Sequence, residues 1–399
     1  MNVEKKTNLI IKAIKSVCLT NNEKYPISLH EPNFKNSNSL KYLKDCIETG
    51  WVSSSGEFVK RFEQKICEYT KAKYCVALAS GTVALRLGLH VIGVRQNDEV
   101  LIPPMSFVAT ANAVSHLGAF PHFIDIDEET LGICPNSLNK RLEEVGELKK
   151  GNLINKFTGR KISAIIPVHI FGNPAKIFAL KSIAKKWGIP IIEDAAEALG
   201  SWILNKDNKI HCGLIGEMGA ISFNGNKIIT TGGGGAIITN NKIYADTARH
   251  LSTTAKVNHS WEFYHDMIGW NDRMPNINAA LGVAQMEKLT SFIENKRNLH
   301  RKYISAFSKI ENCEILNFDS QESNNNWLIT LVFTNKNTEE AKKEVYDLLK
   351  KSHEIGILIR PVWNLLNYLP MYKNNQKSPL NIAENLSKRL VNLPSSSFL

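Results

Sequence analysis

Hydrophobic residues between positions 74 and 239 fall into short continuous runs, and the segments between the runs carry hydrophobic residues at helical spacing. Short continuous runs are typical of strands buried on both faces, and the helical segments are typical of the helices that cover such a sheet. The alternation therefore predicts an α/β unit with a mostly parallel sheet. Strands are expected at residues 74–79, 100–103, 123–127, 162–168, 189–194, 219–223 and 236–239, and helices at 83–91, 109–117 and 177–187.

The end of the chain follows a different pattern. Helical spacing at residues 278–289, 292–307 and 339–351 encloses one strand-like run at 327–333. This mixture, without the regular alternation, indicates a separate α+β unit. We therefore expect two domains, which are residues 1–265 with an N-terminal helix and a large domain, and residues 266–399 as a small C-terminal domain.

The N-terminal apolar run at residues 9–17 is interrupted by Lys12 and Lys15. This pattern favours an amphipathic helix over a signal peptide, and no stretch reaches the ~20 apolar residues of a membrane span. The seven cysteines are scattered and form no C-x-x-C pair, so we expect neither a metal site nor a disulfide framework. A cytoplasmic protein without a membrane partner is predicted.

Composition and charge narrow the possible partners. With 399 residues, of which 43% are hydrophobic and 22% charged, the chain resembles an ordinary globular protein of more than one domain. A net charge of +11 would suit a nucleic-acid binder, but lysines and acids are interleaved rather than gathered into a basic arm. We expect no nucleic-acid partner. Diffuse positive charge also favours encounters with an anionic substrate such as a diphosphate.

Two short motifs lie where a sheet of this kind binds ligands. The turn Ser80-Gly81-Thr82 follows a predicted strand and opens a predicted helix, where free N–H groups bind phosphate, although Ser80 or Thr82 could simply cap the helix. Asp194 stands at the carboxyl end of another strand. A buried carboxylate there needs a cationic partner such as a protonated pyridine nitrogen, unless Asp194 is only a helix cap.

A third motif adds an amine. Ser222 precedes Lys227 by five residues, and the glycine run 232–235 follows. Lys227 could form an imine with a carbonyl cofactor, or it could be an exposed hairpin lysine beside a tight glycine turn. A phosphate turn, an acid at a strand end, and a serine, lysine and glycine run, in this order on an α/β frame, predict a fold-type I pyridoxal 5'-phosphate (PLP) site.

These motifs, with residues 105–112, 193–196 and 269–273 ahead of 279–282, resemble the DegT/StrS-type PLP-dependent sugar aminotransferases from about residue 27 to the C-terminus. The resemblance implies an aspartate aminotransferase-like, fold-type I protein with a large PLP-binding domain and a small α+β domain. It implies Lys227 as the Schiff-base lysine and proton shuttle, with Asp194 on the pyridine nitrogen. It further implies Gly81, Thr82 and Ser222 at the phosphate, Phe107 against the ring face, Glu197 beside the ring hydroxyl, and Asn271 at the phosphate of the neighbouring subunit in a homodimer with shared sites.

Residues 50–54, 224–227 and 231–235 resemble the subgroup associated with legionaminic acid and bacillosamine-type sugars. This implies a nucleotide-sugar 4-aminotransferase that aminates carbon 4 of a UDP-linked 2-acetamido-4-keto-6-deoxyhexose, UDP-2-acetamido-2,6-dideoxy-4-hexulose. Glutamate is the implied amino donor, and surface-glycan or nonulosonic acid biosynthesis the implied pathway. The candidate substrate contacts are Trp51, His169, Arg360 and Trp363.

The chain departs from the family pattern at two positions. Glu197 stands where relatives often have Gln or His, and Gly233 where they often have an acid. Other functions on the same fold are a sugar dehydratase, a different nucleotide-sugar 3- or 4-aminotransferase and a non-catalytic regulatory relative. Lys227 argues against the dehydratase, in which histidine replaces the lysine. Intact Asp194, Ser222 and Lys227 argue against the regulatory relative.

Overall fold

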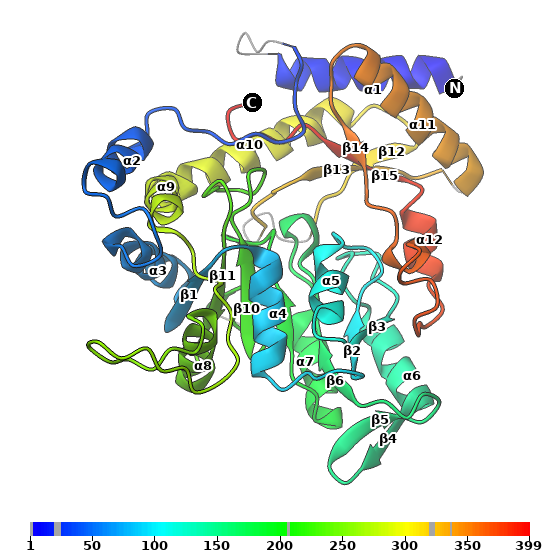
Figure 1. Ribbon diagram of the computed structural model, residues 1–399. Helices are drawn as coiled ribbons and strands as arrows, with labels where there is room; N and C mark the ends of the chain where they lie inside the picture. The colour runs from blue at the N-terminus through cyan, green and yellow to red at the C-terminus, as the bar shows by residue number, and fades with distance from the viewer. Residues whose placement is uncertain (1–2, 20–24, 206–207, 319–323, 336) are drawn as a thin grey trace.

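The computed structural model describes residues 3–19, 25–205, 208–318, 324–335 and 337–399. Two groups of paired strands form the centre of the molecule (Figure 1). A parallel bridge between Ile165 and Ile191 joins the two groups. In pairing order, the first group is β1 (Tyr74–Leu78), β11 (Gly235–Thr239), β10 (Met218–Ser222) and β7 (Ile192–Asp194), and the second is β3 (Phe120–Phe123), β2 (Glu99–Ile102) and β6 (Ile162–Ile165).

The pairing is mostly parallel, as the continuous hydrophobic runs predicted. β10 pairs in parallel with β7, and β2 pairs in parallel with both β3 and β6. Only β11 runs antiparallel to its two neighbours, β1 and β10. All residues of β2, β10 and β11 are buried. These strands have no solvent-exposed face, so their sequences do not alternate between polar and apolar residues.

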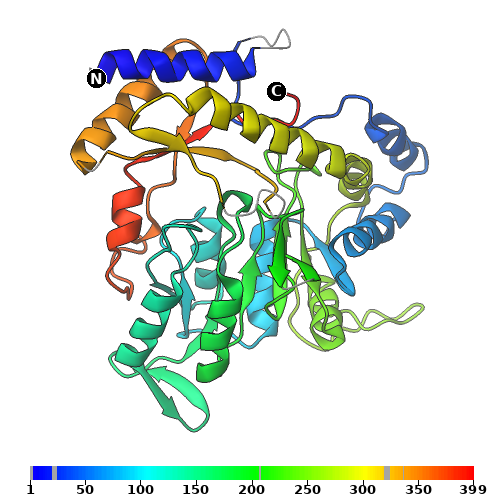
Figure 2. The ribbon, with the colours of Figure 1, turned by 180° about the vertical axis from the view of Figure 1, so that it is seen from behind.

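Helices cover both faces of this sheet, because alternate strand residues point to opposite sides. Val100 and Ile102 pack with one set of helices, whereas Leu101 between them packs with the other. The second set lies in front in the view from behind (Figure 2). The first set is α4 (Gly81–Val91), α5 (Ala109–Ser115) and α8 (Lys242–Ser252), and the second is α6 (Pro135–Val145) and α7 (Ile177–Trp187).

A second, antiparallel sheet belongs to the C-terminal part of the chain. The helix α1 (Val3–Cys18) packs on α10 (Leu289–Phe307) and α11 (Thr338–Glu354), and its apolar face joins the core of this sheet (Figure 1). The N-terminal helix thus lies against C-terminal elements, while the domain boundary at 265/266 stays a prediction. The strands, in pairing order, are β12 (Cys313–Ile315), β13 (Ile329–Phe333), β15 (Leu390–Leu393) and β14 (Arg360–Pro361).

The remaining elements connect and flank these two sheets. α2 and α3 both pack on α9, and two hairpins extend from the loops that follow α6 and β7. A short helix lies ahead of β15. Their bounds are α2 (Ser39–Glu48), α3 (Glu57–Thr70), α9 (Asn276–Met286), β4 (Gly146–Lys149) with β5 (Asn152–Asn155), β8 (Trp202–Asn205) with β9 (Asn208–His211), and α12 (Asn381–Leu386).

The strand predicted at 123–127 was wrong, because β3 ends at Phe123 and begins earlier, at Phe120. Asp125 explains the early end. Its carboxylate accepts hydrogen bonds from the backbone N–H groups of Ile382 and Ala383, at 3.0 Å each, at the start of α12. A carboxylate at a helix start is favoured by the free N–H groups there, so the chain turns toward α12 instead of continuing the sheet.

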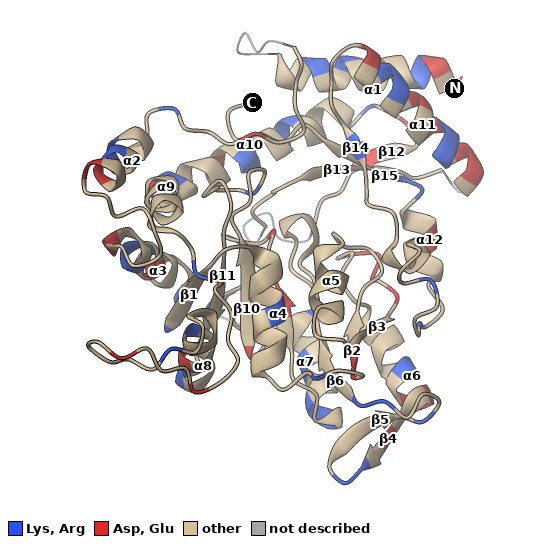
Figure 3. Ribbon diagram, viewed as in Figure 1, with Lys and Arg blue, Asp and Glu red and all other residues tan. Residues whose placement is uncertain are grey.

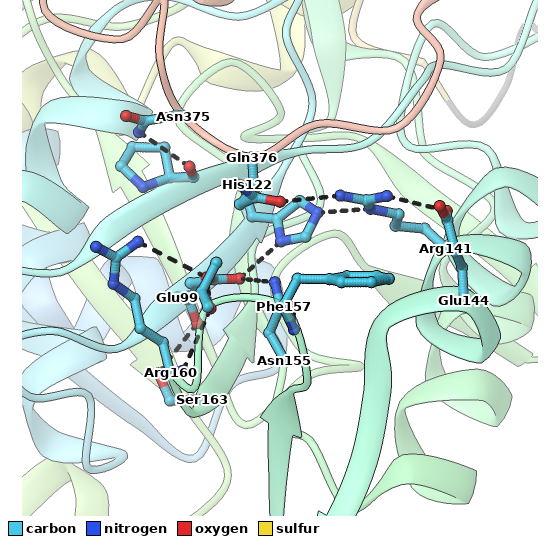
Figure 4. A network of polar contacts seen from close by, with 12 residues as sticks. Glu99, His122, Arg141, Glu144, Asn155, Phe157, Arg160, Ser163, Asn375 and Gln376 are labelled. Atoms are coloured by element: carbon cyan, nitrogen blue, oxygen red, sulfur yellow. Dashed lines mark hydrogen bonds and ion pairs between the residues drawn. The ribbon is translucent and has the colours of Figure 1, made fainter.

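A buried polar network closes the amino end of β2 (Figure 4). Glu99 is fully buried and accepts hydrogen bonds from His122 and Asn155, at 2.9 Å each, and from the Thr158 hydroxyl at 2.6 Å. Arg141 Nε donates to His122 Nε2 at 3.0 Å, so the other ring nitrogen carries the proton that Glu99 accepts. The network joins the β4–β5 hairpin to the sheet.

Charged side chains are spread over the whole molecule, with both signs interspersed (Figure 3). Within the described part of the chain, no helix is long and apolar enough to cross a membrane. The cytoplasmic location stays a prediction.

Candidate active site

A cavity of about 870 Å³ lies where the carboxyl ends of β7 and β10 face the C-terminal sheet. Crevices at the carboxyl ends of parallel strands are the usual ligand sites of open α/β sheets. Most of the residues singled out from the sequence line this cavity, although they are spread over almost three hundred positions of the chain. They are Gly81, Thr82, Phe107, Asp194, Glu197, Ser222, Lys227, Arg360 and Trp363.

The start of α4 forms one end of the cavity and fits a phosphate. Ser80 accepts a hydrogen bond from the Val83 N–H at 3.2 Å. Ser80 therefore does cap the helix, which was one of the two roles considered for this turn. The N–H groups of Gly81 and Thr82 come before that of Val83, in the first turn of α4. The N–H groups of a first turn have no partner within the helix, so an anion is favoured there. A side chain at Gly81 would stand 2.9 Å from Ser222 Cβ, so only glycine lets the two segments approach this closely.

Asp194 lies on the floor of the cavity and has no ion-pair partner among the described residues. Its carboxylate accepts hydrogen bonds from the Thr110 hydroxyl at 2.8 Å and from the Ala196 N–H at 3.1 Å. Burial raises the pKa of Asp194 despite these two donors. A buried carboxylate in this state fits a protonated ring nitrogen, which would supply the missing positive charge.

Lys227 projects into the same cavity, and its side chain is only 11% exposed, which removes the exposed-hairpin alternative. Its Nζ lies 3.2 Å from Glu197 Oε1 and 3.9 Å from the centre of the Trp327 ring. Glu197 also accepts a hydrogen bond from the Phe171 N–H at 2.8 Å. Burial raises the pKa of Glu197, and the neighbouring Lys227 opposes this rise.

Aromatic side chains and one arginine also line the cavity. Trp363 stacks on Phe171 with ring centres 5.3 Å apart and meets Phe107 edge-on at 6.3 Å. Phe107 lines the cavity and is 52% exposed. Arg360 is exposed at the start of β14 and lines the cavity. Gly233 also borders the cavity and has open space where a side chain would project.

Three of the residues predicted from the sequence lie outside this cavity lining. His169 is fully buried, where Nδ1 accepts from the Ala175 N–H and Nε2 donates to Glu193 at 2.9 Å, so its ring supports the core behind Asp194. Trp51 is 59% exposed on the surface. Asn271 is exposed too, and its backbone pairs with that of Thr253.

Comparison with known proteins assigns the family. Residues 34–399 match the model of the DegT/DnrJ/EryC1/StrS aminotransferase family. The chain belongs to this family. A GDP-perosamine synthase from Escherichia coli O157:H7 is 32% identical, with 92% of this chain and 93% of that protein covered. A family member from Brucella abortus has a similar solved structure, with a TM-score of 0.79, 26% identity and 91% of each chain covered.

The DegT-family assignment confirms the predicted fold class, enzyme class and cofactor. The protein is a PLP-dependent sugar aminotransferase with a fold-type I architecture. The PLP form of a Streptococcus pneumoniae protein described as a putative sugar aminotransferase shares the fold, with a TM-score of 0.80, 23% identity and 94% and 95% of the two chains covered. The phosphate seat at α4 and the uncompensated Asp194 fit this cofactor.

The sequence missed cavity residues whose role depends on distant contacts. Thr110, which donates to Asp194, stands inside the family motif at 105–112, so the motif was the only available signal for it. His30 lines the cavity from the N-terminal segment, and its two buried ring nitrogens have no hydrogen-bond partner among the described residues. Trp327 and Asn392 reach the cavity from the C-terminal unit, and no local pattern distinguishes them from core residues.

Proposed function

We propose that this DegT-family enzyme moves an amino group from glutamate to carbon 4 of a nucleotide-linked 4-keto-6-deoxy sugar. The first candidate acceptor is UDP-2-acetamido-2,6-dideoxy-4-hexulose. The observation that carries the proposal is that the amine of Lys227 shares one cavity with a phosphate-type helix start and a buried carboxylate. Because these three groups match the three functional parts of PLP, the cavity is the proposed reaction site.

The cofactor-holding residues act by position and charge. The N–H groups of Gly81 and Thr82, with the hydroxyl of Ser222, would hold the phosphate at the start of α4. Asp194 would keep a proton on the ring nitrogen, and Phe107 would pack on the ring face. When bound there, PLP would supply an aldehyde that reacts with amines and a protonated ring that withdraws electrons from the reacting carbon.

Lys227 and Glu197 are the residues proposed to take part in proton transfer. The amine of Lys227 takes up and releases the proton that moves at carbon 4 of the sugar. Glu197, 3.2 Å from this amine, can stabilise it when charged and hold a hydrogen bond to the ring hydroxyl when protonated. Burial raises the pKa of Glu197, which favours its protonated form, while the charge of Lys227 favours the ionised form.

The wall opposite the sheet is the proposed substrate side. Arg360 is a cation at the cavity edge and would bind a carboxylate of glutamate or the diphosphate of the sugar nucleotide. Trp363 offers an aromatic face for the sugar or base. His169 is fully buried and its ring is not open to the substrate.

A GDP-linked sugar is the second candidate acceptor. The likeness to GDP-perosamine synthases from Escherichia coli O157:H7 and Vibrio cholerae, each 32% identical, favours it. To decide, UDP- and GDP-linked 4-keto-6-deoxy sugars are offered separately with glutamate, and amino-sugar formation is followed by mass spectrometry. A kcat/KM at least tenfold higher for the UDP sugar is expected. Equal or lower values for it would favour the GDP sugar, and no product from either would refute the 4-keto-sugar proposal.

We also propose a homodimer in which Asn271 of one chain completes the phosphate site of the other. Asn271 is exposed and does not belong to the lining of its own cavity, which supports this proposal. In a two-fold dimer, such a contact would occur in both sites. Mixing Asn271→Ala with Lys227→Ala chains should restore activity, because one site of the mixed dimer contains both native residues. Mixed dimers without recovery, formed from an impaired Asn271→Ala variant, would place Asn271 in its own chain's site.

A further inference from the structure

Trp327 reaches Lys227 from the opposite half of the molecule. It lies just ahead of β13 in the C-terminal unit, is 2% exposed and borders the cavity. The face of its ring lies 3.9 Å from Lys227 Nζ. Its indole N–H also donates a hydrogen bond of 2.7 Å to the backbone carbonyl of Asn226, the residue before the lysine. One side chain therefore contacts both the amine of Lys227 and the backbone that carries it.

Asn325 fixes the position of Trp327. Its side-chain oxygen accepts a hydrogen bond from the Trp327 N–H at 2.8 Å. Its amide nitrogen donates to the backbone carbonyls of Glu197 and Leu199, at 2.8 and 2.9 Å. One buried asparagine thus links the backbones of Trp327 and Glu197, the two residues whose side chains contact the amine.

Gly172 gives the asparagine its place. A side chain at Gly172 would overlap the Asn325 side-chain oxygen at 1.9 Å, and the backbone there has a φ of +90°, which favours glycine. The Ser201 hydroxyl accepts a hydrogen bond from the Asn325 N–H at 3.0 Å. This anchorage is buried and consists of contacts within the protein.

A lysine side chain has four rotatable bonds, so an amine released from a covalent bond can adopt many positions. We propose that Trp327 is a positioning residue that holds the free amine of Lys227 over its ring, within reach of Glu197, when the amine is not bonded to the cofactor. This proposal rests on the proposed function of Lys227. The attraction between an ammonium group and an indole face, together with the bond to Asn226, restricts both ends of the side chain.

Paired substitutions separate the two contacts. Trp327→Phe keeps a ring face but loses the donor to Asn226, Trp327→Gln keeps a donor but loses the ring, and Trp327→Leu loses both. Trp187→Phe serves as a control for the loss of a tryptophan, because the Trp187 indole N–H is buried on α7 without a partner among the described residues. Far-UV circular dichroism and urea unfolding verify that each variant is folded.

The first readout needs no cofactor. Cofactor-free proteins are acetylated briefly at neutral pH, and the fraction of Lys227 modified is measured by peptide mass spectrometry. Because the indole face favours the charged amine, Lys227 should react about two- to fivefold faster in Trp327→Gln and Trp327→Leu than in the wild type. Trp327→Phe should lie between, and Trp187→Phe should match the wild type.

The second readout is the split between kcat and KM. Loss of either contact should lower kcat about two- to tenfold and loss of both should lower it further, while KM for the sugar nucleotide changes less than about twofold. Wild-type labelling together with wild-type kcat in folded Trp327→Leu, or a change confined to KM, would overturn the positioning role. Borohydride reduction of the wild type with bound PLP separates the two proposals: labelling at Lys227 upholds the proposed function even if Trp327 proves neutral, and labelling elsewhere ends both.

Discussion

Buried acids stand at opposite edges of the central sheet, and their surroundings differ. Glu99 begins β2 at the amino edge, and Asp194 ends β7 at the carboxyl edge. Glu99 is surrounded by His122 from β3 and by donors from the single segment 155–160 at the end of the β4–β5 hairpin (Figure 4). Asp194 has two donors and no ion-pair partner among the described residues.

The pKa values of these acids shift in opposite directions. Burial opposes ionisation of both, but the hydrogen bonds from His122, Thr158 and Asn155 outweigh it and lower the pKa of Glu99. At Asp194 burial outweighs the hydrogen bonds, and the pKa is raised. The protein's own donors therefore satisfy the acid at the amino edge, whereas Asp194 at the carboxyl edge is the acid that we propose pairs with a positive charge from a ligand. Both acids are buried, yet Glu99 supports the fold and Asp194 is the proposed partner of a ligand.

The largest effect is expected at the lysine of the unsatisfied edge. Lys227→Ala and Lys227→Arg should both abolish transamination, by a factor of more than about a thousand, because arginine keeps the charge but cannot form the imine. The assay is amino-sugar formation from glutamate, with unfolding curves to verify that the fold is kept. Substantial turnover in Lys227→Ala would place the reactive amine elsewhere.

The next effect concerns the carboxylate itself. Asp194→Asn should retain some PLP but lose activity on the order of a hundredfold or more, because the ring nitrogen no longer has a charged partner. Absorbance of bound PLP and steady-state rates are measured on the same samples. If the variant turned over at nearly the wild-type rate, Asp194 would not be the partner of the ring.

At the satisfied edge, we expect a loss of stability rather than of chemistry. Glu99→Gln should lower the free energy of unfolding by about 3 kcal/mol, because buried donors lose a charged acceptor. Urea unfolding measures the loss, with the exposed Glu143→Gln as a control that should change little. The turnover of the folded fraction should stay at the wild-type level. A large drop in kcat would mean that the two edges are coupled.

The smallest expected effect is a gain in stability, in the Asp194→Asn variant, and it depends on pH. Because the folded-state pKa of Asp194 is raised, the folded protein binds that proton more tightly than the unfolded chain. Wild-type stability therefore falls as the pH rises from about 4 through the raised pKa. Cofactor-free Asp194→Asn lacks this penalty and should melt about 2 °C above the wild type at pH 8, with the gain vanishing toward pH 4. A lower melting temperature at pH 8 would contradict the comparison.

Sequence motifs predicted the site where its residues are local. The turn at Gly81 and the Ser222-to-Lys227 segment each place their groups within a few positions, so their order along the chain predicts their arrangement in space. His169 follows a strand in the same way, but its ring turns inward to Glu193. The direction in which a side chain points depends on neighbours that hydrophobic spacing does not specify.

The missed features depend on distant parts of the chain. The approach of Trp327 to Lys227 joins residues a hundred positions apart, and Asp125 ends β3 through a helix that begins at Asn381. Hydrophobic periodicity indicates which residues are buried, but it does not indicate which distant segment packs against them. The proposed roles of Trp51 at the substrate and of Asn271 in the neighbouring subunit stay predictions, because both residues lie outside the cavity lining of their own chain.

The packing of α1 has a consequence for the order of biosynthesis. This helix leaves the ribosome early, yet α10 and α11, which cover its apolar face, begin only at Leu289 and Thr338. At about 5–20 residues per second, the interval is on the order of tens of seconds. During this time the nascent chain presents Ile10, Ile14 and Val17 without their final contacts. The α/β unit between these segments can complete its sheet first, so α1 would reach its contacts with α10 and α11 after that sheet has formed.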